Sequence, residues 1–95
     1  MHLIEDGEAQ AALDDALEKW EGTRVAWECA TWVILHDPNV GLALSDDGKI
    51  RTFTYEGARS VKQPTITIIY EVGRHETIIR AAKFTEAQYG TAGRA

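Results

Sequence analysis

The sequence predicts an α+β domain in which two antiparallel helices pack on one face of a small antiparallel sheet. Apolar residues recur at helical spacing between residues 8 and 36. From residue 50 to residue 84 the pattern alternates and β-branched residues are frequent, which is typical of strands. Because the chain has 95 residues, we expect residues 1–95 to form a single domain with one core.

The two helices are predicted over residues 8–20 and 23–36. The first has a single apolar stripe and ends before Gly22, a natural helix stop. The second is apolar around most of its circumference, so we expect it to be the more buried helix, with Cys29 and the tryptophans packed inside. The short link between them favours an antiparallel pair.

Five strands are predicted, two short and three longer. Short strands are expected at residues 2–4 and 42–44, and longer strands at residues 50–55, 65–72 and 75–84. Polar and glycine-containing segments separate them. Residues 85–95 form a polar tail that we expect to be partly flexible.

The last two predicted strands form a hairpin whose register can be proposed. Residues 73 and 74, a glycine and an arginine, suit a two-residue loop. In that register Arg80 lies directly opposite Thr67. Glu71 and Glu76 would then be neighbours of like charge, so a longer loop is an open alternative.

The two halves of the chain differ strongly in charge. Residues 1–48 contain eleven acidic and two basic residues, a net of −9, whereas residues 49–95 contain four acidic and eight basic residues, a net of +4. These sum to the −5 of the whole chain. A cationic, strand-rich segment is a candidate surface for a polyanion. The alternative is that helix surfaces simply collect glutamate.

Several classes of protein are excluded by composition. No apolar run is long enough to span a membrane, and the first residues do not resemble a signal peptide. A single cysteine excludes an intrachain disulfide. His2, His36 and His75 are widely separated and lack metal-ligand spacing. We therefore expect a cytoplasmic protein with no metal, no cofactor and no membrane contact.

The expected order of elements is a short strand, two antiparallel helices and a three-stranded meander. Residues 37–44 contain a proline–glycine–leucine connection, residues 66–72 an apolar strand with a late aromatic residue, and residues 78–84 a strand with two cations. Over residues 1–90 this pattern resembles the RelE/ParE toxin superfamily. Thr67 departs from it, since the family often has an arginine there, and many family toxins are basic overall.

The resemblance implies the toxin component of a type II toxin–antitoxin system, with a cognate antitoxin as partner. Lys83 and Tyr89, six residues apart, resemble the basic residue and tyrosine of the ribosome-dependent ribonuclease branch. The resemblance therefore implies a metal-independent mRNA endoribonuclease, with Arg80, Lys83 and Tyr89 as catalytic candidates. Cations of the strands and loop are candidate RNA contacts, since they hold phosphate: Arg51, Arg59 and Lys62.

Two other functions stay open at this point. One is the gyrase-directed branch of the superfamily, whose members bind a protein and perform no chemistry. The other is a non-toxic interaction module on the same fold. The candidate residues also have structural alternatives: Arg80 could pair with Glu56 or Glu71, Lys83 could protect a sheet edge, and Tyr89 could dock the tail on the core.

Overall fold

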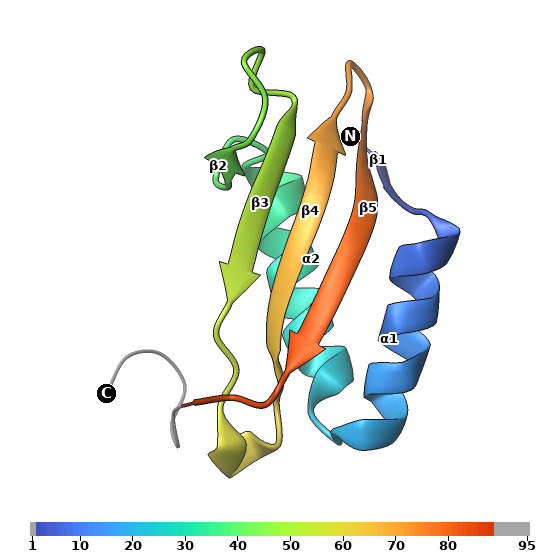
Figure 1. Ribbon diagram of the computed structural model, residues 1–95, viewed down its shortest axis with the longest axis vertical. Coiled ribbons are helices and arrows are strands. Elements are labelled where there is room, and N and C mark those ends of the chain that lie inside the picture. Colours follow the sequence, from blue (N-terminus) through green and yellow to red (C-terminus); the bar gives the residue numbers. More distant parts are fainter. Residues whose placement is uncertain (1, 89–95) are drawn as a thin grey trace.

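A computed structural model describes residues 2–88, apart from the side chain of His2. Its elements, in chain order, are β1 (His2–Glu5), α1 (Gly7–Lys19), α2 (Thr23–His36), β2 (Leu42–Ala43), β3 (Ile50–Tyr55), the short 3-10 helix η1 (Arg59–Val61), β4 (Thr65–Val72) and β5 (Glu76–Thr85). The prediction of an α+β fold with two leading helices is confirmed (Figure 1). None of the described helices is long and apolar enough to cross a membrane.

The five strands form one sheet in the order β1-β5-β4-β3-β2. β1 pairs with β5 in parallel orientation, whereas every other neighbouring pair is antiparallel. The sheet is therefore mixed, which corrects the expectation of a purely antiparallel sheet. The reason is that β5 ends the meander with a free edge, and β1 occupies that edge while running in the same direction.

The hairpin between β4 and β5 has a longer loop than the two-residue turn predicted from the sequence. Val72 lies opposite Thr77, so four residues form the loop. The Gly73 N–H closes it by donating to the Glu76 carbonyl at 2.7 Å. The longer loop keeps Glu71 from lying beside Glu76, which removes the like-charge contact of the shorter register.

A β-bulge shifts the register of this pair once more, between Ile69 and Tyr70 of β4. At this point β5 contains one residue more than β4, and the extra residue is Arg80. As a result Lys83 lies opposite Thr67. The prediction that Arg80 faces Thr67 is therefore wrong, because the longer loop shifts the pairing by two residues and the bulge by one more, and alternation reveals neither.

The helices and the sheet share one core. Its buried residues come from α1, α2, β4 and β5: Ala9, Ala26, Trp27, Ala30, Ile34, Ile66, Ile68, Tyr70 and Ile79. In Figure 1, α2 lies behind the sheet and α1 lies beside β5. α2 contributes more buried residues than α1, so the prediction that it is the more buried helix is confirmed.

Side-chain hydrogen bonds fix the ends of α1. Asp6 caps its start, where a carboxylate oxygen accepts from the Ala9 N–H at 3.3 Å. At the other end, the Thr23 hydroxyl lies 2.9 and 2.8 Å from the carbonyl oxygens of Ala16 and Trp20. This buried hydroxyl donates to the last turn of α1 and so joins the two helices.

Part of the apolar surface of α2 points outward. Cys29 is exposed, and Trp32 and Val25 are 60% and 55% exposed. They border a shallow hollow of about 410 Å³. The expectation that Cys29 and all the tryptophans belong to the core is wrong for Cys29 and Trp32, and Trp20 is half-buried outside the core cluster. A helix that is apolar around most of its circumference cannot turn every apolar side chain toward one sheet.

Candidate functional site

The face of the sheet turned away from the helices is uncovered within residues 2–88 (Figure 1). Successive side chains of a strand point to opposite faces, so the strand register assigns each residue to one face. In β4, the even-numbered residues from Ile66 to Tyr70 are buried against the helices, and the odd-numbered residues from Thr65 to Glu71 lie on the other side. We call this other side the open sheet face.

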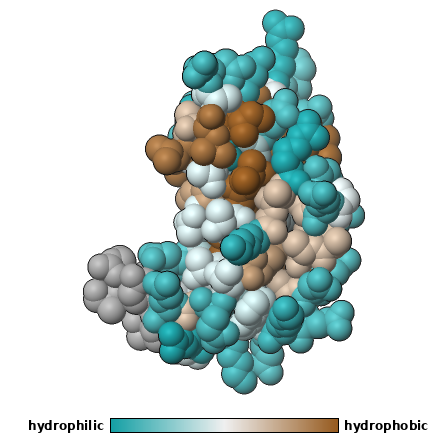
Figure 2. Space-filling view, viewed as in Figure 1, coloured by the Kyte–Doolittle hydropathy of each residue, from teal (hydrophilic) through white to brown (hydrophobic). Residues whose placement is uncertain are grey.

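Two rows of apolar side chains cross the open sheet face near the β4–β5 loop. We call them the apolar rows, and the strand pairing places these apolar residues in them: Ile4, Leu42, Ile50, Ile69, Ile78 and Ala81. Each row also contains one polar residue, Glu71 between Ile78 and Ile50 in one row and Thr52 between Ile69 and Leu42 in the other. At the two edges Ile4 is 43% and Leu42 is 73% exposed. Figure 2 shows hydrophobic surface gathered on the upper half of this face.

The remainder of the open sheet face is polar and rich in hydroxyl groups. Threonines from β3, β4 and β5 cover it: Thr54, Thr65, Thr67 and Thr85. Thr54 and Thr67 lie opposite each other with their hydroxyl oxygens 3.5 Å apart. Lys83 stands exposed beside Thr67 and makes no ion pair with any described residue. The face therefore has an apolar half and a hydroxyl half.

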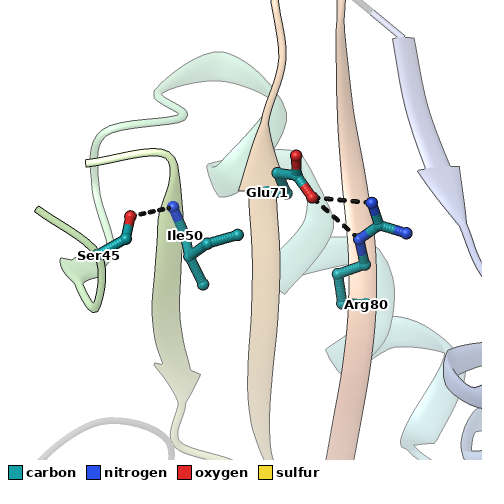
Figure 3. A network of polar contacts seen from close by, with 4 residues as sticks. All are labelled: Ser45, Ile50, Glu71 and Arg80. Carbon is teal, nitrogen blue, oxygen red and sulfur yellow. Dashed lines mark hydrogen bonds and ion pairs between the residues drawn. The ribbon is translucent and has the colours of Figure 1, made fainter. Parts of the chain in front are cut away.

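An ion pair interrupts the apolar rows. Both Nε and Nη2 of Arg80 donate to Oε1 of Glu71, at 3.1 and 2.8 Å (Figure 3). The hydrogen bond and the charge of Glu71 raise the pKa of Arg80. The bulge at Arg80 permits this contact, because the extra residue re-aims the side chain along the sheet. A phosphate that used Arg80 would have to compete with Glu71 for it.

Arg51, the second residue of β3, lies on the helix side of the sheet. Figure 3 shows the start of β3, where the Ile50 N–H donates to the Ser45 hydroxyl at 3.0 Å. Arg51 follows, and its guanidinium binds three backbone carbonyls around the α2–β2 connection and the β2–β3 turn: Gly48 and Gly41 at 2.8 Å and Asn39 at 3.2 Å. Arg51 therefore ties two loops together, on the side of the sheet opposite Lys83.

The remaining basic candidates lie at the far end of the sheet, away from the apolar rows. Arg59 donates through Nε and Nη2 to the carbonyls of residues 87 and 88, at 2.6 and 3.1 Å. Lys62 forms an exposed ion pair with Glu21 at 3.3 Å. Tyr89, the third catalytic candidate, lies outside the described residues.

The five described candidates thus fall in three places. Arg80 and Lys83 share the open sheet face, Arg59 and Lys62 share the far end, and Arg51 lies on the helix side. Acid–base cleavage of RNA needs several groups within hydrogen-bond reach of one phosphate. The described part of the chain does not gather these cations into one patch. It also contains no group of three or more potential metal ligands.

Sequence reasoning did not single out the apolar rows, although their signal is present. Ile68 and Ile69 are consecutive in β4, and Ile78 and Ile79 are consecutive in β5. An antiparallel strand that is buried on one side only needs apolar residues at alternate positions. Isoleucines on both faces of neighbouring strands therefore indicate a second apolar surface.

No family model, no curated protein and no solved structure matches this chain. The assignment to the RelE/ParE superfamily accordingly stays a proposal, based on the order of elements and the local sequence resemblance.

Proposed function

We propose that this chain is a RelE/ParE-like toxin component that acts by binding a protein through the open sheet face. The observation on which this rests is the pair of apolar rows on an uncovered face. Apolar patches that stay exposed on a small domain typically mark protein interaction sites. The toxin assignment itself rests on the order of elements and the sequence resemblance.

The composition of the face supports a protein partner rather than a nucleic acid. Burial of the isoleucines against apolar side chains contributes roughly 25 cal/mol for each Å² removed from water. The phosphate backbone of a nucleic acid offers no matching apolar surface, and a protein's affinity for it depends mainly on unpaired cations of the protein. On the described part of this face, Arg80 is paired with Glu71, which leaves Lys83 as its unpaired cation.

Two kinds of protein are proposed to use this face in the cytoplasm. One is the cellular target, of which gyrase is the candidate that the resemblance implies, and the other is the cognate antitoxin. If both occupy the apolar rows, they bind in competition, and the antitoxin neutralises the toxin by covering the surface that the target needs.

The test is induced expression in bacteria with growth as the readout. The double variant Ile69→Thr/Ile78→Thr keeps β-branched residues in both strands but removes apolar surface from the rows. We expect the parent chain to arrest growth with transcripts intact and the double variant to relieve the arrest. Thr67→Ser, on the hydroxyl half, is the matched control and should arrest growth like the parent. Circular dichroism checks that each variant is folded.

A second candidate function is ribosome-dependent cleavage of mRNA, and one observation favours it. Lys83 is exposed without an ion pair among the described residues, and it lies next to the hydroxyl half of the open sheet face. If cleavage is the activity, Lys83→Ala and Tyr89→Phe relieve growth arrest, and mapped transcripts show cuts that disappear in both variants. Intact transcripts with undiminished arrest in both variants would remove this candidate, and harmless expression of the parent would favour a non-toxic interaction module.

A further inference from the structure

A hollow of about 280 Å³ lies where the α1–α2 link, the segment after η1 and residues 86–88 meet. Three cations and an indole stand among its lining residues: Lys19, Trp20, Arg59 and Lys62. We call it the Trp20 pocket. None of its lining residues belongs to the apolar rows, so it is a different place from the open sheet face.

One backbone contact and one exposed side-chain contact connect the walls of the Trp20 pocket. The Gly22 N–H donates to the Lys62 carbonyl at 2.8 Å. A Cβ at Gly22 would lie 2.5 Å from the Val61 carbonyl oxygen, so only glycine permits this approach. On the third side, the Trp20 indole N–H donates to Glu86 at 3.2 Å. Three segments that are distant in sequence are therefore held in place before any ligand arrives, which lowers the ordering cost of binding.

The backbone of Lys62 is unusual for a lysine. Its φ is 56°, in the left-handed region that favours glycine and asparagine. Residues kept in sparsely populated conformations cluster at functional sites. Lys62 is the C-cap of η1, a position that often takes this conformation, and its side chain lines the pocket.

The charges around the pocket favour an anion. Three cations stand against the two carboxylates of Glu21 and Glu86, a net of +1 in a chain whose net charge is −5. The side chains of the Lys62–Glu21 pair are 64% and 79% exposed, and pairs this exposed are weak enough to exchange partners. Among its described contacts Arg59 uses Nε and Nη2, so Nη1 can serve a ligand.

We propose that the Trp20 pocket binds a nucleoside phosphate. The phosphate lies between Lys62 and Arg59, whose charged donors suit it, and the base lies against the indole of Trp20, since aromatic side chains stack on bases. At about 280 Å³ the hollow is slightly smaller than the usual range for ligand sites, about 300–1,000 Å³, which limits the ligand to about one nucleotide. A free mononucleotide and the phosphorylated end of an RNA share this chemistry.

The test is an NMR titration of the ¹⁵N-labelled full chain with adenosine 5′-monophosphate. We expect saturable shifts of the Trp20 indole N–H and of the Gly22 amide. Adenosine without phosphate and inorganic phosphate alone should each bind at least about tenfold more weakly, since each lacks one of the two contacts. Lys62→Asn, which tolerates a positive φ, should weaken binding about tenfold.

Matched controls separate a built site from general charge attraction. Lys19→Gln should weaken nucleotide binding, whereas Lys49→Gln, at the β2–β3 turn, should leave it unchanged. A 5′-phosphorylated RNA tetranucleotide, its dephosphorylated form and the mononucleotide distinguish a free nucleotide from an RNA end as the ligand. If the phosphorylated tetranucleotide binds more tightly than both of the others, the site is assigned to RNA ends. Absence of saturable shifts at Trp20, or equal weakening by Lys49→Gln and Lys62→Asn, overturns the proposal and leaves the open sheet face proposal untouched.

Discussion

The hydroxyl of Tyr70 provides the sharpest test of how the sheet is joined to the helices. Tyr70 is fully buried, and its hydroxyl donates to the Pro38 carbonyl at 2.6 Å while accepting from the Gly41 N–H at 3.0 Å. Both partners belong to the connection between α2 and β2. Tyr70→Phe removes one oxygen and leaves a carbonyl and an N–H without their partner.

The magnitude follows from these two contacts. Each lost hydrogen bond costs about 1 kcal/mol of folding free energy, and a buried group left unsatisfied costs about 1–3 kcal/mol. Gly41 is buried, so its N–H bears that cost, whereas Pro38 is half-buried and water replaces part of its lost contact. We therefore expect Tyr70→Phe to lower the free energy of unfolding by about 2–3 kcal/mol.

The assay is urea unfolding followed by tryptophan fluorescence, with Tyr55→Phe as the matched control. Tyr55 is half-buried and donates to Gln63 at 3.3 Å, so its loss should cost less than about 1 kcal/mol. Hydrogen exchange at the Gly41 amide should quicken in Tyr70→Phe alone. A loss for Tyr70→Phe no larger than that for Tyr55→Phe would refute the reasoning about the buried hydroxyl.

Three further outcomes can be checked on the same material. Asp6→Ala removes the cap of α1 and should lower the free energy of unfolding by about 1 kcal/mol, measured by urea unfolding. Gly57→Ala places a Cβ 2.1 Å from the Pro64 carbonyl oxygen, so we expect a loss above about 3 kcal/mol or no folded protein by circular dichroism. Burial raises the pKa of Tyr70 in the folded state. The stability that the protonated Tyr70 side chain contributes is therefore complete below its unfolded-state pKa of about 10, and it is lost as the pH rises from that value through the folded-state pKa. Burial also raises the pKa of Tyr55, so the tyrosinate absorbance of the native chain should show one more late-titrating tyrosine than that of Tyr70→Phe.

The secondary structure could be predicted from the sequence because it depends on local patterns. The helical stripe that ends at Trp20 and the alternation from Thr65 to Val72 are visible in short windows, and the structure places these elements within one residue of the prediction. Their pairing depends on distant residues. The length of the hairpin loop and the bulge at Arg80 both depend on such distant contacts, so the predicted register is wrong along the whole hairpin.

The candidate site was predictable only in part, for the same reason. The alternation indicates that Ile69 and Ile78 share a face with Thr67, but it does not reveal that neither of the two described helices covers that face. The partners of Arg51 are carbonyls of loops whose course the sequence does not fix. The sequence offers two glutamates, Glu56 and Glu71, as partners for Arg80, and in the structure Arg80 pairs with Glu71.

The most direct measurement of the proposed mode of action is a growth assay that compares Ile69→Thr/Ile78→Thr with Lys83→Ala, with transcripts mapped in each culture. If the apolar rows hold a protein target, the isoleucine variant grows while Lys83→Ala still arrests growth, and transcripts stay intact throughout. Growth restored by Lys83→Ala, together with cut transcripts from the parent chain, would contradict this mechanism and assign the activity to RNA cleavage.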